Sequence, residues 1–317
     1  MAFNSLKYLR DCIDSIYSSP PDTSYDLIVV DNASTDGTSR FVADEYPGIV
    51  LISNKENTGF AAANNQVIKT TDSKYILLIN SDCEVYEDSI DRLMDYMDKN
   101  PRVAIAGPKI INSDGSVQYS CRRFPSFFSA AAHTILTHIY SGNPISRKYM
   151  MADINRDEPF SVDWVSGSCM IIRRQALEET GRLDERYFMY VEDIDICYRM
   201  WQNGWEVHYM PYSDVLHHVG GSSRKTVFKK GEGPDGRGIE AGEDRSTGDA
   251  PAEEIYAGGS RTSKRAAIRA SYRMQKSVFY FFWKNYRKSI KVVFIPLLLM
   301  ILGLRFLIAA IKSMVKR

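Results

Sequence analysis

The sequence predicts an α/β fold with a mostly parallel sheet flanked by helices. Over residues 1–106, short runs of apolar, β-branched residues alternate with segments of helical spacing. Such runs are typical of buried parallel strands, and their alternation with helices is typical of layered α/β proteins. With 317 residues, 44% of them hydrophobic, the chain is long enough to bury a full core.

The elements are expected in the following order. The strands are residues 26–31, 49–53 and 75–80, with the sequences DLIVVD, IVLIS and YILLIN. The helices are residues 34–45, 59–70 and 87–99, and the first begins with Ser, Thr and Asp capping residues. Residues 107–218 are more mixed and predict a hairpin at 111–120, helices at 126–140 and 192–203, and a strand at 169–174. We expect this second part to decorate the same sheet.

The composition then changes sharply. Residues 224–263 are rich in Gly, Lys, Glu and Asp and carry almost no apolar side chains. Such a segment cannot bury enough apolar surface to pack by itself, so it is expected to be a mobile loop, a lid or a disordered segment.

Residues 264–317 predict a C-terminal tail of membrane-associated helices. An aromatic and basic helix is expected at 269–287, followed by the apolar run VVFIPLLLMILGL. The 19 residues 292–310 are just long enough to span a bilayer, but Pro296 and Arg305 suit an interfacial helix equally well. A buried helix of a soluble domain is the third alternative. The flanking lysines and arginines argue against it, because they favour anionic lipid headgroups.

Charge and cysteine content exclude several classes of protein. The 40 basic and 39 acidic residues leave a net charge of +1, which gives no whole-molecule attraction to nucleic acid. The five cysteines are odd in number and form no C-x-x-C pair, so a disulfide framework or a zinc ribbon is not expected. They fit buried thiols of a protein in the reducing cytosol.

Polar residues end or follow each of the first three expected strands. They are Asp31 at the end of the first, Asn57 and Gly59 after the second, and Asn80, Ser81 and Asp82 at the end of the third. Ligands of open α/β sheets bind at the carboxyl ends of the strands. Two carboxylates, amides and glycine backbone at one edge would suit a nucleotide and a divalent cation.

Five segments, taken together, resemble a known family. They are DNASTDGT, NKENTGFAAANN, LLINSDCEV, WVSGSCMIIRR and FMYVEDIDICYRMWQNGWEVHYMPYSDVLHHVGGSS. Their order and spacing resemble the inverting glycosyltransferases of family 2, near the rhamnosyltransferase-like members that build bacterial surface polysaccharides. The resemblance implies a GT-A domain over residues 1–223, a nucleotide-diphosphate sugar donor and a glycan or polyprenyl-linked acceptor.

The resemblance also implies roles for the residues at the strand ends. Asp31 would accept a hydrogen bond from the nucleotide base; its alternative role is to cap the following helix. Asn57 and Gly59 would let the backbone approach the nucleotide, or would simply form a loop-to-helix turn. Asn80 and Ser81 would complete the donor site.

The metal motif is only partly present. Asp82 matches the last carboxylate of the family's D-x-D motif, which holds Mg²⁺ or Mn²⁺ against the diphosphate. Its first position is Asn80, a neutral ligand, so the site has one charge fewer. His217 matches a family histidine that reaches the metal or the diphosphate.

The predicted catalytic residues open the helix at 192–203. A sugar hydroxyl that attacks an anomeric carbon needs a general base, which the family places at the position of Asp193. Glu192 would orient the acceptor or support the site, and Asp195 would be structural. The alternative is that all three acids only complement the helix dipole. Trp164, Gly167 and Ser168 match a region that holds the acceptor or donor sugar, although a core role for Trp164 is equally compatible with its sequence context.

The N-terminus differs from the pattern of the family that the sequence resembles. The family opens with a buried strand that precedes Tyr-Asn-Ser, whereas this chain begins Met1-Ala2-Phe3-Asn4-Ser5, so we expect an incomplete base pocket. Two other functions stay open: a nucleotidyltransferase and a non-catalytic nucleotide-sugar-binding protein at the membrane. The main prediction is a glycosyltransferase on the cytoplasmic face of the cell membrane.

Overall fold

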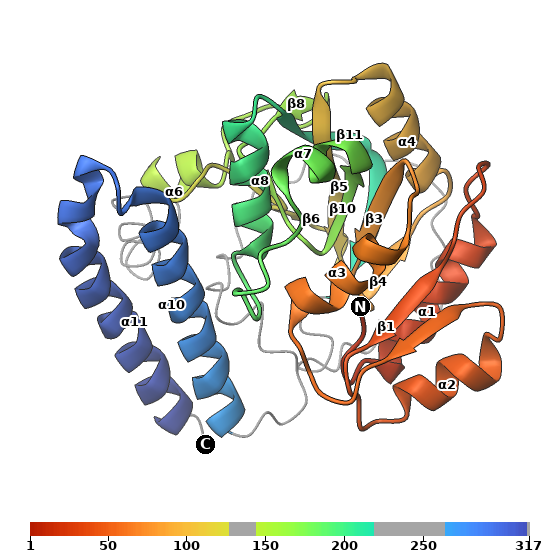
Figure 1. The fold of residues 1–317 in the computed structure, drawn as a ribbon, viewed down its shortest axis with the longest axis horizontal. Coiled ribbons are helices and arrows are strands. Elements are labelled where there is room, and N and C mark those ends of the chain that lie inside the picture. Colours follow the sequence, from red (N-terminus) through yellow and green to blue (C-terminus); the bar gives the residue numbers. More distant parts are fainter. Residues whose placement is uncertain (127–143, 219–263, 316–317) are drawn as a thin grey trace.

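The computed structural model describes residues 1–126, 144–218 and 264–315, which form an α/β fold (Figure 1). Its first element is a helix that the sequence analysis did not predict, α1 (Leu6–Ser18). This helix buries Leu9, Cys12, Ile13 and Ile16. Their spacing of three and four residues is that of an amphipathic helix with one face on the core.

The first three predicted strands and helices are confirmed. The strands are β1 (Ile28–Asp31), β2 (Val50–Ser53) and β3 (Tyr75–Ile79), and the helices are α2 (Thr38–Glu45), α3 (Phe60–Thr70) and α4 (Ser89–Lys99). β1 and β2 pair in parallel as a separate two-stranded sheet, from Ile28 with Val50 to Asp31 with Ser53.

Ala2 lies at the edge of β1 that faces away from β2. Its N–H donates to Val30 O at 2.8 Å, and its carbonyl accepts from Asn32 N at 2.8 Å. Ala2 and Asp31 thus form an isolated parallel bridge beside β1.

The main sheet is mixed, so the prediction of a mostly parallel sheet was wrong. Its strand order is β3-β10-β5-β11-β4, with β4 (Cys83–Val85), β5 (Val103–Asn112), β10 (Cys169–Arg173) and β11 (Glu206–His217). Only β5 and β11 run parallel; β10 is antiparallel to both of its neighbours, and β4 is antiparallel to β11. Continuous apolar runs indicate burial on both faces of a sheet, but they do not fix the direction of the neighbouring strand.

Smaller elements complete the described chain. They are β6 (Val117–Gln118), β7 (Cys121–Arg122), α6 (Pro144–Tyr149), β8 (Phe160–Ser161), β9 (Trp164–Val165), α7 (Arg174–Thr180) and α8 (Glu192–Gln202). The predicted hairpin at 111–120 and the predicted helix at 192–203 are confirmed by β5–β6 and α8. The helix predicted at 126–140, beyond its first residue, and the loop predicted at 224–263 lie outside the described residues.

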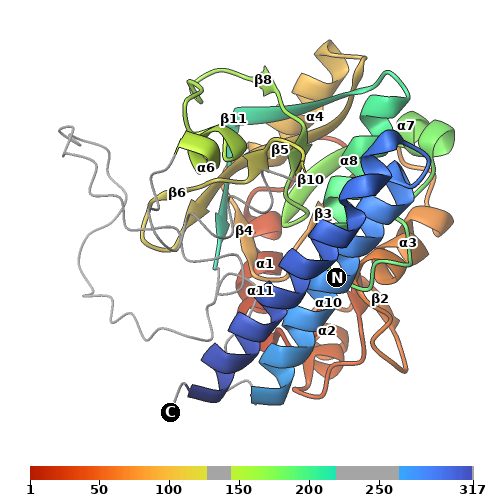
Figure 2. The same cartoon turned by 90° about the vertical axis from the view of Figure 1, so that its left-hand side faces the viewer.

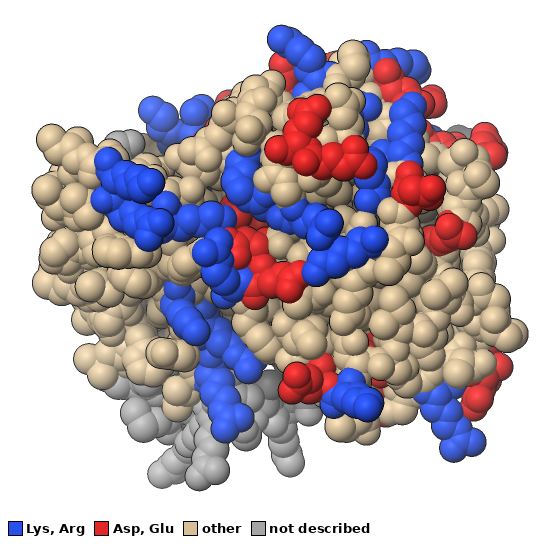
Figure 3. Space-filling model, in the orientation of Figure 1, with Lys and Arg blue, Asp and Glu red and all other residues tan. Residues whose placement is uncertain are grey.

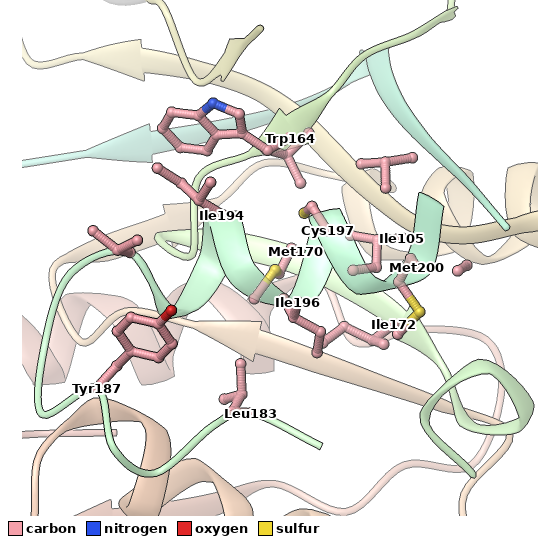
Figure 4. Close-up of a cluster of buried hydrophobic side chains, with 14 of the residues drawn as sticks. Ile105, Trp164, Met170, Ile172, Leu183, Tyr187, Ile194, Ile196, Cys197 and Met200 are labelled. Atoms are coloured by element: carbon pink, nitrogen blue, oxygen red, sulfur yellow. The ribbon is translucent and has the colours of Figure 1, made fainter. Parts of the chain in front are cut away.

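Two C-terminal helices pack side by side against this fold (Figures 1 and 2). They are α10 (Lys264–Tyr286) and α11 (Ile295–Val315), joined through a 3-10 turn at Ile290–Phe294. Phe281 and Phe282 of α10 are fully buried in the same cluster as Trp164 and the α8 side chains Ile194 and Met200. Figure 4 shows part of this cluster, in which α8 packs against Ile105 of β5 and Met170 and Ile172 of β10.

Among the described residues, no helix combines the length and the apolar composition needed to cross a bilayer.

Candidate active site

The antiparallel pairing of β3 with β10 brings two predicted site segments together. Ile79 at the end of β3 pairs with Cys169 at the start of β10. Asn80 N then donates to Ser168 O at 2.8 Å, which places residues 80–82 beside residues 166–168. Ser81 lies between Asn80 and Asp82 and is partly exposed.

A second pairing brings the predicted metal ligands together. β11 pairs with β4, with His217 opposite Cys83, and His217 Nε2 lies 3.3 Å from Asp82 Oδ1. His217 Nδ1 lies 3.0 Å from Gln118 Oε1, an atom that only accepts hydrogen bonds. Nδ1 therefore carries a proton, and Nε2 faces the carboxylate of Asp82, to which it can donate as an N–H or beside which it can bind a cation as a lone pair.

The chemistry of this pair fits a divalent cation. His217 Nε2 and Asp82 Oδ1, 3.3 Å apart, are close enough for both to bind one cation. A carboxylate with a neutral imidazole nitrogen is a donor set that Mn²⁺ accepts.

Cys83 belongs to the same cluster without being a suitable ligand. Single atoms of Asp82, Cys83 and His217 all lie within 4.8 Å of one another. However, the Cys83 side chain is fully buried and its Sγ donates to Ser168 O at 3.4 Å. Burial raises the pKa of this thiol well above its usual value, so it stays protonated.

The predicted base lies at the N-terminus of α8, within hydrogen-bond distance of Gly167. Asp193 is half-buried, and its carboxylate accepts hydrogen bonds from Gly167 N at 3.1 Å and Ile194 N at 2.8 Å. Burial raises the pKa of Asp193, and these two N–H groups oppose that rise. A carboxylate with a raised pKa that still reaches solvent is suited to accept a proton.

Glu192 is more deeply buried than Asp193. It is 6% exposed, and its Oε2 has no hydrogen-bond partner within the described chain. Burial, and then the charge of Asp193, raise the pKa of Glu192 well above the usual value of a carboxyl group. Glu192 is therefore the protonated member of the pair, which can donate a hydrogen bond into the site.

The residues predicted to bind the acceptor connect these two groups. Gly167 donates to Asp193, and Ser168 O accepts from Asn80 N. The Ser168 hydroxyl is buried and has no partner in the part of the chain that the structure describes. Trp164 is only 5% exposed and donates from Nε1 to Arg123 O at 2.9 Å. Its ring belongs to the core, and the contact of Gly167 and Ser168 with an acceptor stays a prediction.

Asp31 is held by hydroxyl groups of its own loop. It is 2% exposed; its Oδ1 accepts from Ser34 N at 3.2 Å and from Ser34 Oγ, and its Oδ2 accepts from Ser39 Oγ. The side chain thus organises the turn before α2, and its contact with a nucleotide base stays a prediction.

Asn57 and Gly59 lie in a network centred on Asn32. Asn32 is completely buried, and its amide donates to Asn57 Oδ1 at 3.0 Å and to Gly59 O at 3.2 Å. Its Oδ1 accepts from Thr58 N at 3.0 Å. This network fixes the loop that the sequence assigns to the nucleotide.

The backbone at Gly59 requires glycine. Its φ is 88° and its ψ is 175°, a combination that essentially only glycine adopts. A Cβ at this position would lie 2.2 Å from the carbonyl oxygen of Phe188, which accepts from Phe60 N at 2.8 Å. The glycine therefore allows the loop that carries Asn57 and Gly59 to contact the loop that precedes α8.

Replacing Gly59 with alanine is expected to destabilise the protein. The left-handed φ and the clash with Phe188 O together predict a loss of about 3 kcal/mol in the free energy of unfolding. Urea denaturation monitored by circular dichroism would measure it, with Gly48→Ala as the control because a Cβ there has no neighbour within 4 Å. Equal stability of the two variants would contradict the close approach.

A cleft elsewhere on the described part of the molecule is separate from this site. It has a volume of about 900 Å³ and contains none of the predicted site residues. Its lining is strongly charged and includes Lys69, Arg174, Asp184 and Lys284; Figure 3 shows basic and acidic side chains gathered on this face. Most of these charges pair with one another, as Lys69 does with Glu185 at 2.8 Å.

Residues 1–181 match the sequence profile of the family described as Glycosyl transferase family 2. The chain belongs to glycosyl transferase family 2. In this family 2 chain the match includes β1 to β10 and thus Asp31, Asp82 and Ser168, whereas Asp193 and His217 lie beyond it.

Relatives of this family 2 chain include two rhamnosyltransferases. N-acetylglucosaminyl-diphospho-decaprenol L-rhamnosyltransferase of Mycobacterium tuberculosis is 34% identical over 203 residues, which cover 61% of this chain and 66% of that protein. Rhamnosyltransferase WbbL of Escherichia coli is 25% identical over 231 residues, which cover 70% of this chain and 83% of that protein. The chain thus spans just under two thirds of the mycobacterial relative.

Two solved structures have a similar fold. A mannosyltransferase from Pyrobaculum calidifontis in complex with GDP-Man and Mn²⁺ superposes with a TM-score of 0.51 at 16% identity, over 98% of this chain and 71% of that one. TarS 1-349 of S. aureus has a TM-score of 0.50 at 13% identity, over 98% of this chain and 79% of that one. These similarities support a GT-A-like fold for this family 2 chain.

Sequence reasoning missed three residues that hold this site. Asn32 follows Asp31 directly, so its position at a strand end was a usable signal. Gln118 and Lys284 gave no such signal, because they reach His217 and Asp195 over about 100 and 90 residues of chain. Contacts of this kind follow from the tertiary fold and have no local pattern.

Proposed function

We propose that this chain is an inverting glycosyltransferase that moves a sugar from a nucleotide-diphosphate sugar to a hydroxyl of a lipid-linked glycan. The observation that carries the proposal is that two chemically different groups lie beside residues 166–168. Asp82 and His217 would form a cation site next to Ser168, and Asp193, which accepts from Gly167 N, would form a base. An inverting transfer needs these two groups on opposite sides of the reacting carbon.

Each site residue has a separate role in the proposed reaction. The loop that carries Asp31, Asn57 and Gly59 would hold the nucleotide, with Asn80 and Ser81 at its diphosphate end. Asp82 and His217 would hold Mg²⁺ or Mn²⁺, whose positive charge stabilises the departing diphosphate. Asp193 would accept the proton of the acceptor hydroxyl while that oxygen attacks the anomeric carbon. Glu192, protonated, would donate a hydrogen bond that orients the acceptor.

The sugar and acceptor are proposed from the relatives. The mycobacterial relative is named for L-rhamnose and for a diphospho-decaprenol acceptor that carries N-acetylglucosamine. We therefore propose rhamnose as the sugar and a polyprenyl-diphosphate-linked glycan as the acceptor, in the synthesis of a surface polysaccharide.

Transfer is tested with the purified full chain. Candidate UDP-, dTDP- and GDP-sugars, including dTDP-rhamnose, are offered with a polyprenyl-diphosphate N-acetylglucosamine and Mn²⁺, and products are detected by mass spectrometry. Inverted anomeric configuration in the product, measured by NMR, is the expected result. Nucleotide binding without transfer would instead favour a non-catalytic binding protein, and pyrophosphate release from a nucleoside triphosphate would favour a nucleotidyltransferase.

We further propose that α11 and the turn before it dock this enzyme on the cytoplasmic face of the membrane. The support is a set of exposed apolar side chains at alternating spacings of three and four residues, which are Ile290, Val293, Leu297, Met300, Leu304 and Leu307. Arg287 and Lys288 are exposed at the start of this set and suit anionic headgroups. An apolar helix face with basic residues at its end is typical of an interfacial helix.

Acidic substitutions in this face are expected to weaken lipid binding. The double variant Met300→Asp, Leu304→Asp should lose about tenfold or more in partitioning onto vesicles of phosphatidylcholine and phosphatidylglycerol, because two charges would have to enter the interface. Flotation of vesicles in a density gradient measures this. The control Tyr25→Asp, Val50→Asp adds the same charge at exposed apolar positions elsewhere and should bind as the unaltered chain does. Equal flotation of the two double variants would contradict the assignment of this face.

A further inference from the structure

The loop that carries the acidic pair has a strained backbone. Residues 184–191 form the last part of the connection from α7 to α8, and the last two, Tyr190 and Val191, have φ values of 71° and 74°. The left-handed region is unfavourable for side chains with a Cβ, and especially for the β-branched Val191. Glu192 and Asp193 follow directly. Such a conformation persists only where surrounding contacts hold it.

One set of contacts comes from α10. Ser277 Oγ donates to Met189 O at 3.0 Å, and the Arg273 guanidinium lies 3.9 Å from the centre of the Phe188 ring. Ser277 is buried, so its bond to the loop is shielded from competing water. These contacts hold Phe188 and Met189, the two residues immediately before the strained ones.

A second set is formed by Lys284 of α10. Its Nζ lies 2.8 Å from Asp184 Oδ2 at the start of the loop and 2.7 Å from Asp195 Oδ1 in the first turn of α8. Asp195 is completely buried and also pairs with Arg199 Nε at 2.9 Å. Burial alone would raise the pKa of Asp184, but hydrogen bonds from Arg186 and Lys284 hold it far below its usual value. Lys284 therefore links Asp184 to Asp195, and Asp193 lies in the segment between them.

We propose that α10 is a positioning element of the active site, in which Lys284 and Ser277 hold residues 184–191 so that Asp193 meets its substrate. Neither residue touches the reacting groups; both act through the loop. The proposal rests on the proposed transferase function, because it takes Asp193 as the base. It adds that the C-terminal helices are part of the catalytic apparatus as well as the proposed lipid contact.

The experiment compares three variants of the full chain. Lys284→Met removes the charge and keeps the length of the side chain, and Ser277→Ala removes one hydrogen bond. Lys276→Met is the matched control, since Lys276 is exposed on the same helix. For each, kcat, the KM values and donor affinity are measured with a short-chain soluble acceptor, at a temperature at which circular dichroism shows the folded state. Hydrogen exchange of the amides of residues 187–193 is measured in parallel.

We expect Lys284→Met to lower kcat by about 100-fold, because a displacement of about 1 Å at a reacting group has an effect of this size. Ser277→Ala should lower kcat by about fivefold, the equivalent of one ordinary hydrogen bond. Donor affinity should stay within about twofold, and exchange at residues 187–193 should accelerate in both variants but not in Lys276→Met.

Two results would overturn the proposal. One is unchanged exchange in a folded Lys284→Met variant; the other is faster exchange with unchanged kcat, which would make Lys284 only structural. Hydrogen exchange needs no turnover. If the unaltered chain transfers no sugar, the proposed function fails while exchange still tests whether α10 holds the loop.

Discussion

Asp193→Asn is expected to lower kcat by about 10²- to 10⁴-fold, the range that a general base contributes. Asparagine keeps the shape of the side chain and one oxygen that accepts from Gly167 N or Ile194 N, but it cannot take a proton from the acceptor hydroxyl. Donor affinity should therefore be almost unchanged. Steady-state kinetics together with calorimetric titration of the donor nucleotide would measure both quantities.

The pH dependence of the unaltered enzyme follows from the environment of Asp193. The base works as a carboxylate, so activity is lost as the pH falls through its pKa. Because burial raises that pKa, the acid limb of the kcat profile should lie at higher pH than the value of about 3.9 expected for an exposed aspartate. In Asp193→Asn this limb should disappear from the residual activity.

The control for this prediction is Asp72→Asn, which makes the same chemical change at an exposed position between α3 and β3. It should retain the kinetics of the unaltered chain. A folded Asp193→Asn variant with kcat reduced less than about threefold would assign the base to another group. Glu192→Gln would then be the next variant to examine, since Glu192 is the neighbouring carboxyl in the site.

The sequence predicted the parts of this site that depend on local order. Asp31 ends β1, and Asn57 and Asp82 come a few residues after β2 and β3, as their order in the sequence predicts. The acidic pair was predicted because Glu192 and Asp193 open a helix, which the structure confirms as α8. The resemblance to a family then supplied what no local pattern contains, the expectation that Asp193 and Asp82 lie in one site.

Other features depend on pairings between distant segments. The sheet is mixed because β10 lies between β3 and β5, and the apolar run of β10 looks the same in either direction. The sequence analysis missed the helix α1, although its buried positions have clear helical spacing. The strain at Tyr190 and Val191 could not be predicted from the sequence, since neither residue type favours a left-handed backbone.

Removal of the cation is expected to abolish nucleotide-diphosphate binding, and Asp82→Asn should reproduce much of that loss. Asp82 is the only carboxylate in the cation cluster formed by the described residues, because Asn80 replaces the other acid of the family motif. Asparagine in place of Asp82 would leave a neutral donor set of amide oxygen and imidazole. Calorimetric titration with UDP, dTDP and GDP, each with Mn²⁺ and after EDTA, should show at least a tenfold lower affinity in the variant, or about 1.4 kcal/mol.

Gln118→Leu separates a cation site from an ion pair between His217 and Asp82. If His217 is a ligand through Nε2, the Gln118 oxygen holds the proton on Nδ1 and fixes the orientation of the ring. Without that oxygen, Mn²⁺ affinity should fall by about 10- to 100-fold. If His217 is instead protonated and paired with Asp82, Gln118 is irrelevant to any cation, and EDTA should leave nucleotide binding unchanged. Val117→Ala, at an exposed neighbour in β6, is the control for damage to that strand. Equal Mn²⁺ affinity in Gln118→Leu and Val117→Ala would therefore remove His217 from the cation site and leave Asp82 to act alone.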